Sequence, residues 1–461
     1  MSPKQAAGPR PPSVERVLAR VRDRLDSPRE AAPVLAVTRQ VVDDERERLG
    51  ADGSAPRDPD QLAAIVVERL DAFAGPVVTT TTTVINATGV IVHTNLGRAP
   101  WPAIVAEAAA EIATRYGLLE LDRETGRRGA RARIAEDHLV ALTGAGDALV
   151  TNNNAAALAL AVGLAGRSGV VVSRGELVEI GGGVRIPDIV RRAGSRLVEI
   201  GTTNRTRADD FEAPLVEGRA RAVLRVHPSN FAMSGFTETP DPAAVAELAH
   251  RHGAIVIDDL GSGALIDTAA YGLTHEPLPS ERLAVGSDVV TFSGDKLVGG
   301  PQAGLVVGRA DLVAKMRRDP LARAMRPDKV TMAGVALTLG LYRAGRATSD
   351  IPVWRMISTP VPALRARAEG LRTRLGDGVE VADLRSTVGG GSLPGETLPS
   401  IGLAVRAPSA TRALTALRRS DPPVIGRIED GRVVLDLRTV EPDRDDDLAT
   451  VVKRTLGAVG R

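Results

Sequence analysis

One lysine in a glycine-rich segment is the residue of this chain best suited to covalent chemistry. Lys296 follows the apolar stretch Val289–Phe292 and lies in the segment TFSGDKLVGGPQ, residues 291–302. A Schiff-base lysine needs its amine held against a flat ring, with a hydroxyl such as that of Ser293 and free backbone N–H groups nearby for a phosphate. Taken alone, the segment is more typical of a solvated loop lysine, so the rest of the chain must decide between the two interpretations.

Two other segments place hydrogen-bonding side chains directly after predicted strands. Asn153 and Asn154 follow the stretch Ala148–Thr151 and open an alanine-rich helix. Free N–H groups at a helix N-terminus, together with amide side chains, can bind a phosphate, although an asparagine N-cap explains the same residues. Asp258 and Asp259 end another apolar stretch. A carboxylate there could hold a protonated pyridine nitrogen, or it could be a turn residue before glycines.

A fourth segment, HPSN at 227–230, ends a further predicted strand. The Asn230 amide could reach a ring hydroxyl, whereas His227 is typical of a core histidine. In chain order, the four strand ends supply a phosphate cradle, an amide, an acid and a lysine. This order matches pyridoxal-phosphate enzymes of the aspartate-aminotransferase type. We therefore expect pyridoxal 5'-phosphate as the cofactor, held as a Schiff base on Lys296, and no metal.

The elements that position these segments alternate between strand and helix from about residue 84 to 307. Short β-branched stretches predict strands at 148–151, 170–173, 196–200, 222–226, 254–258 and 289–292. Nearly continuous apolar strands separated by helices indicate an α/β fold with a parallel sheet covered on both faces. Ligands bind at the carboxyl ends of such strands, which is where all four segments lie.

The N-terminal part of the chain has a different pattern. Apolar residues at three- and four-residue spacing predict a helical domain at 13–75, and Asp60 is the expected N-cap of its last helix. Residues 1–12 are rich in proline and predict a disordered tail. The threonine-rich stretch at 76–84 resists helix formation and predicts a linker.

Two domains are expected after the linker. The large cofactor-binding domain spans 85–345, and a small α+β domain follows at 346–461. Within the small domain, the dipeptide Asp430-Gly431 lies between two β-rich stretches and predicts a hairpin turn. The chain shows no internal repeat.

Composition excludes several classes of protein. The 461 residues are 43% hydrophobic but include only 2 Trp, 3 Tyr and 5 Phe, so the core must be built from aliphatic side chains. The absence of cysteine excludes disulfides, thiolate metal sites and cysteine nucleophiles. A formal net charge of +2 does not by itself indicate nucleic-acid binding, and no DNA partner is expected. Neither a transmembrane stretch nor a signal peptide is evident, so we expect a cytoplasmic location without a membrane partner.

Six longer motifs resemble those of one known family, bacterial selenocysteine synthase (L-seryl-tRNA(Sec) selenium transferase). They are INATGVIVHTNLGR at 85–98, SRGELVEIGG at 173–182, GTTNRT at 201–206, DLGSG at 259–263, SGDK at 293–296 and PVIGRI at 423–428. The resemblance extends from about residue 13 to the C-terminus. Its least diagnostic part is the N-terminal helical region.

The resemblance implies a fold-type-I pyridoxal-phosphate enzyme that converts seryl-tRNA(Sec) to selenocysteinyl-tRNA(Sec). The implied path is β-elimination of the serine hydroxyl to an aminoacrylate, followed by addition of selenium from selenophosphate. It further implies a ring-shaped homo-oligomer of dimers, a decamer, in which the N-terminal helical domain grips the tRNA. From the residues alone, dimerisation or capping stays open as an alternative role for that domain, because its arginines are accompanied by many acids and it offers no aromatic platform for base stacking.

The resemblance also assigns roles to individual residues. Lys296 is the implied Schiff-base lysine, Asp259 rather than Asp258 the implied partner of the pyridine nitrogen, and Asp295 an implied aid to the chemistry. Three arginines are implied to bind the anionic selenium donor: Arg98, Arg323 and Arg326. An arginine fork suits phosphate-like oxygens, and the last two lie three residues apart on one helical face. Glu176 lies in a loop from which the residue stacking on the cofactor ring could come.

Two other functions are compatible with these residues. The first is a pyridoxal-phosphate-dependent lyase or aminotransferase for a small amino substrate, built on the same scaffold. Relatives of that kind are expected to lack or alter the N-terminal helical domain, which is present here at full length. The second is a tRNA-binding protein that has lost the cofactor, which the presence of both Lys296 and Asp259 argues against.

Overall fold

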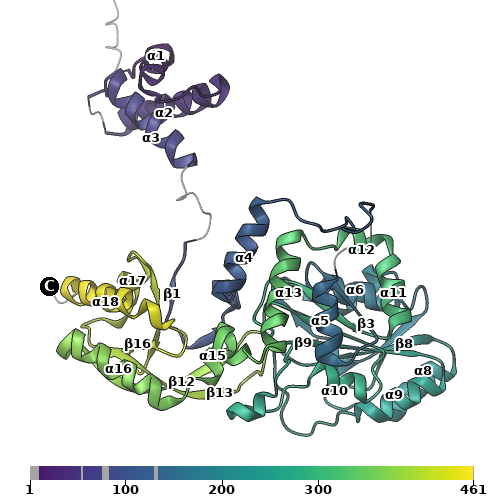
Figure 1. Ribbon diagram of the computed structural model, residues 1–461. Helices are drawn as coiled ribbons and strands as arrows, with labels where there is room; N and C mark the ends of the chain where they lie inside the picture. The colour runs from purple at the N-terminus through teal and green to yellow at the C-terminus, as the bar shows by residue number, and fades with distance from the viewer. Residues whose placement is uncertain (1–9, 53–54, 75–81, 129–132, 460–461) are drawn as a thin grey trace, which may run out of the picture. The chain divides into compact units, whose positions relative to one another are not determined.

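The computed structural model, drawn as a ribbon in Figure 1, describes residues 10–52, 55–74, 82–128 and 133–459. The chain divides into two compact units, Met1–Thr83 and Val84–Arg461. Apart from residues 10–12 and 82–84, the expected tail and linker lie outside the described residues. Among the helices that are described, none has the length and apolar character needed to cross a membrane.

The described part of the first unit contains three helices: α1 (Val14–Arg24), α2 (Ala31–Asp52) and α3 (Pro59–Ala74). Their apolar faces meet in one core that includes Val17, Val21, Val41, Leu62 and Val66. The helix α3 begins before Asp60, which was expected to cap it. Asp58 and Gln61 instead exchange hydrogen bonds of 2.8 and 3.0 Å between side chain and backbone, which is a capping box. Pro59 favours this start because it has no N–H to satisfy.

A buried carboxylate joins α2 to the segment that follows it. The Glu45 side chain accepts hydrogen bonds from Arg48 Nε and from the backbone N–H of Arg57, each at 2.9 Å. The Arg48 hydrogen bond is the main cause that holds the pKa of Glu45 below its usual range. The first unit therefore depends on an ionised group as well as on its apolar core.

A seven-stranded sheet forms the centre of the second unit, in the order β3-β11-β10-β9-β8-β4-β7. All neighbouring strands are parallel except at β11, which runs antiparallel to both β10 and β3. Each strand predicted from the sequence is present. The strands are β3 (Asp147–Thr151), β4 (Gly169–Ser173), β7 (Arg196–Ile200), β8 (Ala220–Val226), β9 (Ile255–Gly261), β10 (Val289–Ser293) and β11 (Gly304–Gly308).

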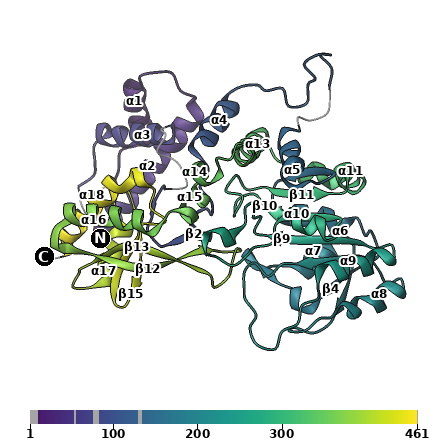
Figure 2. The same cartoon turned by 60° about the horizontal axis from the view of Figure 1, so that its bottom comes forward.

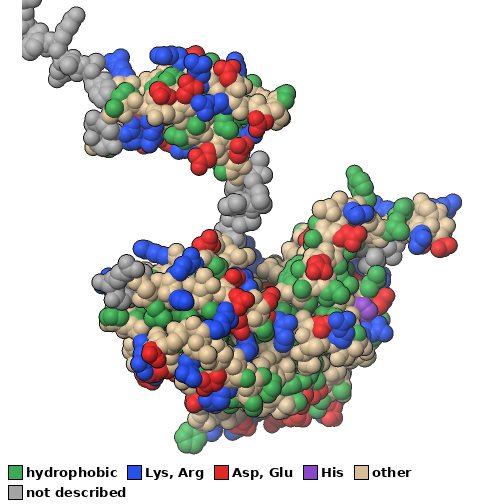
Figure 3. All heavy atoms as spheres, turned by 60° about the vertical axis from the view of Figure 1, so that its left-hand side comes forward, with side chains coloured by type: hydrophobic (Ala, Val, Ile, Leu, Met, Phe, Trp, Pro, Cys, Tyr) green, Lys and Arg blue, Asp and Glu red, His purple; other side chains and the backbone are tan. Residues whose placement is uncertain are grey.

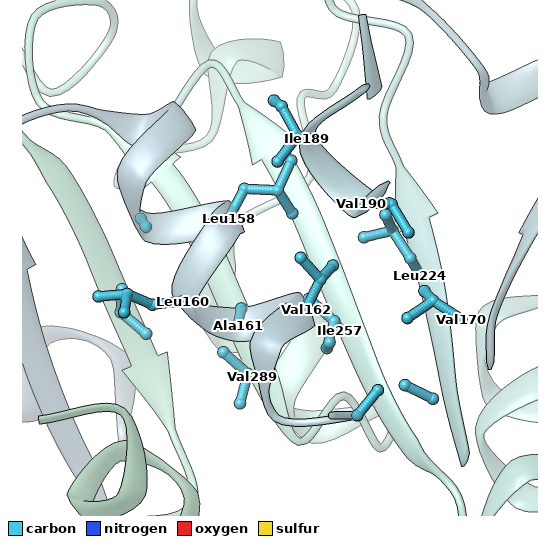
Figure 4. Close-up of a cluster of buried hydrophobic side chains, with 14 of the residues drawn as sticks. Leu158, Leu160, Ala161, Val162, Val170, Ile189, Val190, Leu224, Ile257 and Val289 are labelled. Carbon is cyan, nitrogen blue, oxygen red and sulfur yellow. The ribbon is translucent and has the colours of Figure 1, made fainter. Parts of the chain in front are cut away.

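Helices cover both faces of this sheet. On one face, α6 (Asn154–Gly163), α7 (Ile186–Arg192) and α11 (Ala310–Arg318) pack in a cluster that contains Leu158 and Val289, which Figure 4 shows. On the other face, α5 (Ile134–Thr143) and α13 (Lys329–Arg343) pack against residues such as Val290. Since successive strand residues point to opposite faces, a continuously apolar strand fits a sheet covered on both sides.

A second sheet, in the order β15-β16-β13-β12-β2, lies in the C-terminal part of the same unit (Figure 2). Its strands are β2 (Val90–Val92), β12 (Val379–Gly389), β13 (Thr397–Val405), β15 (Arg427–Glu429) and β16 (Arg432–Asp436). The helices α16 (Val361–Leu375), α17 (Ala410–Arg418) and α18 (Asp445–Val459) share a core with it. The predicted turn at Asp430-Gly431 is present, because Glu429 pairs with Arg432 across it.

The start of the second unit differs from the expected domain boundary. β1 (Ile85–Asn86) pairs with β14 (Val424–Ile425), and β2 pairs with β12, so residues 85–92 belong with C-terminal strands and not with the large sheet. These pairings join residues more than 290 positions apart, which local sequence patterns cannot indicate. The expected boundary near residue 345 stays a prediction, because Val84–Arg461 forms one compact unit.

Candidate active site

A cavity of about 280 Å³ opens at the carboxyl ends of β8, β9 and β10. Its size and its place at the end of parallel strands are typical of a small-molecule site. Seven of the ten residues predicted for the site line it: Arg98, Asn153, Asn154, Asp259, Ser293, Asp295 and Lys296. The structure therefore brings together most of the side chains that the motifs suggested.

The Lys296 amine lies inside this cavity, where its Nζ is 3.4 Å from the carbonyl oxygen of Gly391. Burial lowers the pKa of Lys296, because the charged amine loses its hydration; the nearby Asp259 carboxylate opposes this effect. A lysine with a lowered pKa is more often neutral, and a neutral amine is the form that attacks a carbonyl.

Gly391 allows the backbone to approach that amine closely. It has a φ of +78°, and a Cβ built on it would lie 2.4 Å from Lys296 Nζ and 2.8 Å from Cε. A residue with a side chain would therefore both adopt an unfavourable backbone conformation and displace the amine. The glycine comes from the segment between β12 and β13, so a connection of the second sheet lies against the Lys296 amine.

Asp259 lies at the cavity wall and is held there by two hydrogen bonds. Its Oδ1 accepts hydrogen bonds from Asn154 Nδ2 at 2.8 Å and from Thr291 Oγ1 at 3.0 Å. Burial raises the pKa of this carboxyl, and the two hydrogen bonds oppose the rise. The preceding Asp258 instead accepts a hydrogen bond from Ser287 and does not line the cavity. Of the two acids, Asp259 is thus the one that can meet a ligand.

The N-terminus of α6 faces the same space. The Asn153 side chain accepts a hydrogen bond from Ala156 N at 2.9 Å and caps the helix, and Asn153, Asn154 and Ala155 all line the cavity. The buried Asn154 Oδ1 has no hydrogen-bond partner among the described residues. A helix N-terminus attracts a phosphate, and an unpaired buried amide oxygen indicates that a donor group belongs beside it.

Arg98 and Asp295 form an ion pair at the cavity wall. Arg98 Nη1 lies 2.7 Å from Asp295 Oδ2, and the Ala99 N–H donates to the Asp295 carbonyl oxygen at 3.2 Å. Arg98 has a φ of +65°, a left-handed conformation that costs energy for any residue with a side chain. Such strain persists only where the surroundings impose it, and it is frequent at functional sites.

Asn230 does not line the cavity. Its side chain is exposed, and its Nδ2 donates to the Glu179 carbonyl oxygen at 2.7 Å. His227 and Ser229, from the same HPSN segment, line the cavity in its place. The HPSN segment thus reaches the cavity through His227 and Ser229, because the turn after β8 directs these two residues inward. Their signal in the sequence is that both side chains are polar and directly follow a strand.

Arg323 and Arg326 line a different cavity, of about 530 Å³, where Arg326 Nη1 pairs with Glu120 Oε1 at 2.6 Å. Thr151 lines that cavity while Asn153 lines the first, so the end of β3 lies between the two. Within one chain, the three arginines expected to bind a common anion therefore do not share a cavity.

Glu176 does not lie over the site. Its carboxylate is buried and accepts hydrogen bonds from Arg225 Nε at 2.9 Å and from Val226 N at 3.1 Å, and burial raises its pKa. The residues that line the cavity from this part of the chain are Val178, Gly181 and Val184, at the hairpin of β5 (Glu179–Ile180) and β6 (Val184–Arg185). Because these three residues carry no polar side chain, their chemistry does not mark them as site residues in the sequence.

The residues present fit pyridoxal phosphate. The site combines a buried lysine of lowered pKa, a buried acid on the neighbouring strand and a helix N-terminus suited to a phosphate. D-Glucosaminate-6-phosphate ammonia-lyase has a similar fold: its solved structure superposes with a TM-score of 0.60 at 21% identity, over 83% of this chain and 97% of that one. The fold and site together define the class of fold-type-I pyridoxal-phosphate enzymes.

Within this class, sequence comparison shows the family. Residues 84–441 match the family model described as L-seryl-tRNA selenium transferase. The chain is 45% identical over 459 residues to the L-seryl-tRNA(Sec) selenium transferase of Moorella thermoacetica, with 97% of each chain covered. It is 43% identical over 420 residues to that of Rhizobium meliloti, with 88% of this chain and 89% of the relative covered. The chain belongs to the L-seryl-tRNA selenium transferase family.

Proposed function

We propose that this chain converts seryl-tRNA(Sec) to selenocysteinyl-tRNA(Sec), with selenophosphate as the selenium donor. The observation that carries the proposal is the similarity to a selenium transferase over 97% of the chain, N-terminal helices included, together with the cavity around Lys296. A lyase or aminotransferase for a small amino substrate is less well supported. The solved lyase resembles this chain at 21% identity, which concerns the fold alone.

The residues of the cavity have distinct roles in this proposal. When bound, pyridoxal phosphate links to an amine through its aldehyde and withdraws electrons from the α-carbon of that amine. The backbone N–H groups at Asn153 and Asn154, with the Ser293 hydroxyl, would hold its phosphate side, and Asp259 would keep a proton on its ring nitrogen. Lys296 Nζ, whose pKa is lowered by burial, takes the α-proton of the seryl group as a general base.

Removal of the hydroxyl leaves a double bond at the serine β-carbon, to which selenium adds. Arg98 would bind the phosphate oxygens of the donor, since its guanidinium is always charged and already lies at the cavity wall. Excluding water matters at this stage, because water would otherwise compete with selenium. The apolar side chains of Val178 and Val184 at the cavity wall favour such exclusion.

Arg323 and Arg326 fit the proposal if a second copy of the chain takes part. Within one chain these two arginines line one cavity, whereas Arg98 and Lys296 line another. A selenium donor bound by all three arginines would therefore need Arg323 and Arg326 of one copy to lie near Lys296 of a second copy. A ring-shaped homo-oligomer of dimers, such as a decamer, is the assembly that we propose. The cytoplasmic location expected from the sequence remains a prediction.

The first unit is the proposed tRNA-binding part. Figure 3 shows that Lys and Arg side chains on its surface are interspersed with Asp and Glu. Several of its arginines pair with acids, as Arg24 does with Asp60 at 3.1 Å. Binding to RNA would therefore depend on the shape of the tRNA and on its backbone more than on a uniform basic patch.

A selenium-transfer assay tests the function. The purified protein and a Lys296→Ala control are incubated with seryl-tRNA(Sec), selenophosphate and pyridoxal phosphate, and the esterified amino acid is identified. Selenocysteine formed by the unmutated protein alone would support the proposal. If serine remains intact although the protein holds the cofactor, the tRNA substrate is excluded and small amino substrates should be tested. Loss of tRNA binding after deletion of residues 1–75 would support the role of the first unit.

A further inference from the structure

His227 and Glu276 form an imidazole–carboxylate pair at the wall of the Lys296 cavity. His227 Nε2 lies 3.3 Å from Glu276 Oε1. The Glu276 side chain is 3% exposed, whereas that of His227 is 21% exposed and lines both the Lys296 cavity and a neighbouring cavity of about 300 Å³. The histidine can therefore meet a substrate while the carboxylate stays behind it.

The loop that carries Glu276 is fastened at Glu276 and at the residue before it. The Glu276 N–H donates to Thr268 Oγ1 at 2.9 Å. The preceding His275 contacts Asp267 through Nδ1 at 2.8 Å and Glu281 through Nε2 at 3.0 Å. Glu276 Oε1 has no hydrogen bond among the described residues, so the imidazole of His227 is the group available to it. A buried carboxylate in a fixed loop can hold a histidine ring in one orientation and balance its positive charge.

His227 is fixed at its backbone as well. Its N–H donates to the carbonyl oxygen of Asp259 at 2.9 Å, because β8 and β9 are neighbouring parallel strands. The ring thus starts from the strand next to the acid of the cofactor site. Its position depends on two elements distant in sequence, β9 and the loop after Thr268–Tyr271.

The proposed reaction needs a proton donor that the other groups do not supply. Serine loses its hydroxyl readily only if the oxygen takes up a proton as it leaves. Among the described residues lining the cavity, Lys296 is assigned to the α-proton, and Asp259, which accepts two hydrogen bonds, is assigned to the ring nitrogen. Asp295 is paired with Arg98 as a carboxylate, which has no proton to give. Among the described residues that line the cavity, His227 is the remaining side chain whose ring nitrogens can hold a proton and pass it on.

We propose that His227 protonates the departing serine hydroxyl and that Glu276 is the positioning residue that orients its ring. This inference rests on the proposed function. Lys296 Nζ takes the α-proton, and the electron pair of the Cα–H bond becomes the second bond between Cα and Cβ. The Cβ–Oγ bond breaks with its pair on oxygen, and the proton from His227 turns the leaving group into water. The net change is loss of one water from the seryl group.

A change of leaving group tests this role. His227→Asn, Glu276→Gln and Asp295→Asn variants are assayed with seryl-tRNA(Sec) and with β-chloroalanyl-tRNA(Sec), whose chloride leaves without a proton. We expect His227→Asn to lose roughly 100-fold or more of its selenium transfer from the seryl substrate. It should stay within about tenfold of the unmutated protein on the chloroalanyl substrate, and Glu276→Gln should show the same pattern more weakly.

The possible outcomes separate the alternatives. If His227→Asn loses activity equally on both substrates, His227 is not the acid. If instead Asp295→Asn loses activity on the seryl substrate alone and His227→Asn does not, Asp295 is the acid. An unmutated protein that transfers selenium to neither substrate would overturn the proposed function itself. In the cofactor-free protein, ¹⁵N-histidine NMR should place the proton of neutral His227 on Nε2, facing Glu276. A proton on Nδ1 instead would refute the pairing.

Discussion

Replacing Gly391 by alanine tests whether the backbone beside Lys296 sets the position of its amine. The new Cβ would lie 2.4 Å from Nζ, whereas two such atoms need about 3.5 Å, so the amine must move by about 1 Å. The contact is with the flexible end of a lysine and not with backbone, so the fold can survive while the amine is displaced. A misplacement of this size can cost about 100-fold in rate.

Gly395 provides a matched control in the same segment. Its φ is +81°, close to the +78° of Gly391, but a Cβ there would meet nothing within 4 Å. Each Gly→Ala change should cost about 1–2 kcal/mol of unfolding free energy, because alanine disfavours the left-handed region. The two variants should therefore unfold alike and differ only in the reactivity of Lys296.

The assay follows the bond between the cofactor and Lys296, by its absorbance and by the rate of trapping with borohydride. We expect the Gly395→Ala protein to match the unmutated one and the Gly391→Ala protein to react roughly 100-fold more slowly. Equal rates in the two variants would refute the reasoning, since the contact with the amine would then have no consequence. A much larger stability loss in Gly391→Ala would show that the fold, and not the amine, absorbs the strain.

Three other predictions concern assembly, pH and stability. A Lys296→Ala protein mixed with an Arg323→Ala/Arg326→Ala protein should regain selenium transfer if sites are shared between copies, and mixed oligomers that stay inactive would refute sharing. Asp259→Asn should lower the pKa of Lys296 further, because the carboxylate opposes the effect of burial. The pH midpoint for modification of the cofactor-free amine should then fall, and a rise would contradict this sign. Glu45→Gln should destabilise the first unit by about 1–2 kcal/mol and hasten proteolysis within residues 14–74 of the full chain, whereas unchanged proteolysis would show that the hydrogen bonds of this carboxylate contribute little.

The central sheet could be predicted from the sequence because its signals are local. Each apolar stretch is bounded by turn residues, and the chemistry-bearing residues follow directly at the strand ends. Asp259 and Lys296 could be placed together for this reason, since parallel strands bring their carboxyl ends to one edge. The same reasoning located the HPSN segment but not its inward residues, because the path of a turn depends on packing that the sequence does not display.

Other parts of the site come from distant segments and carry no local signal. Glu276 lies in a loop without a recognisable motif, and Gly391 is 95 residues beyond Lys296. The pairing of residues 85–92 with the C-terminal strands has the same cause, because register between distant strands is set by the finished fold. Arg323 and Arg326 were grouped with Arg98 by family resemblance, and one chain alone does not bring them together.

The pairing of β1 and β2 with β14 and β12 also bears on how the protein is made. A ribosome releases residues 85–92 long before their partners at 379–389 and 424–425 exist, so these strands must wait unpaired while the parallel sheet forms. Gly391, which places the Lys296 amine, arrives in that same late segment. A nascent chain that ends before it therefore contains the reactive lysine without the backbone that positions it. Only the completed chain can therefore bind the cofactor with Lys296 correctly placed, and fragments left by interrupted synthesis would not bind it in this way.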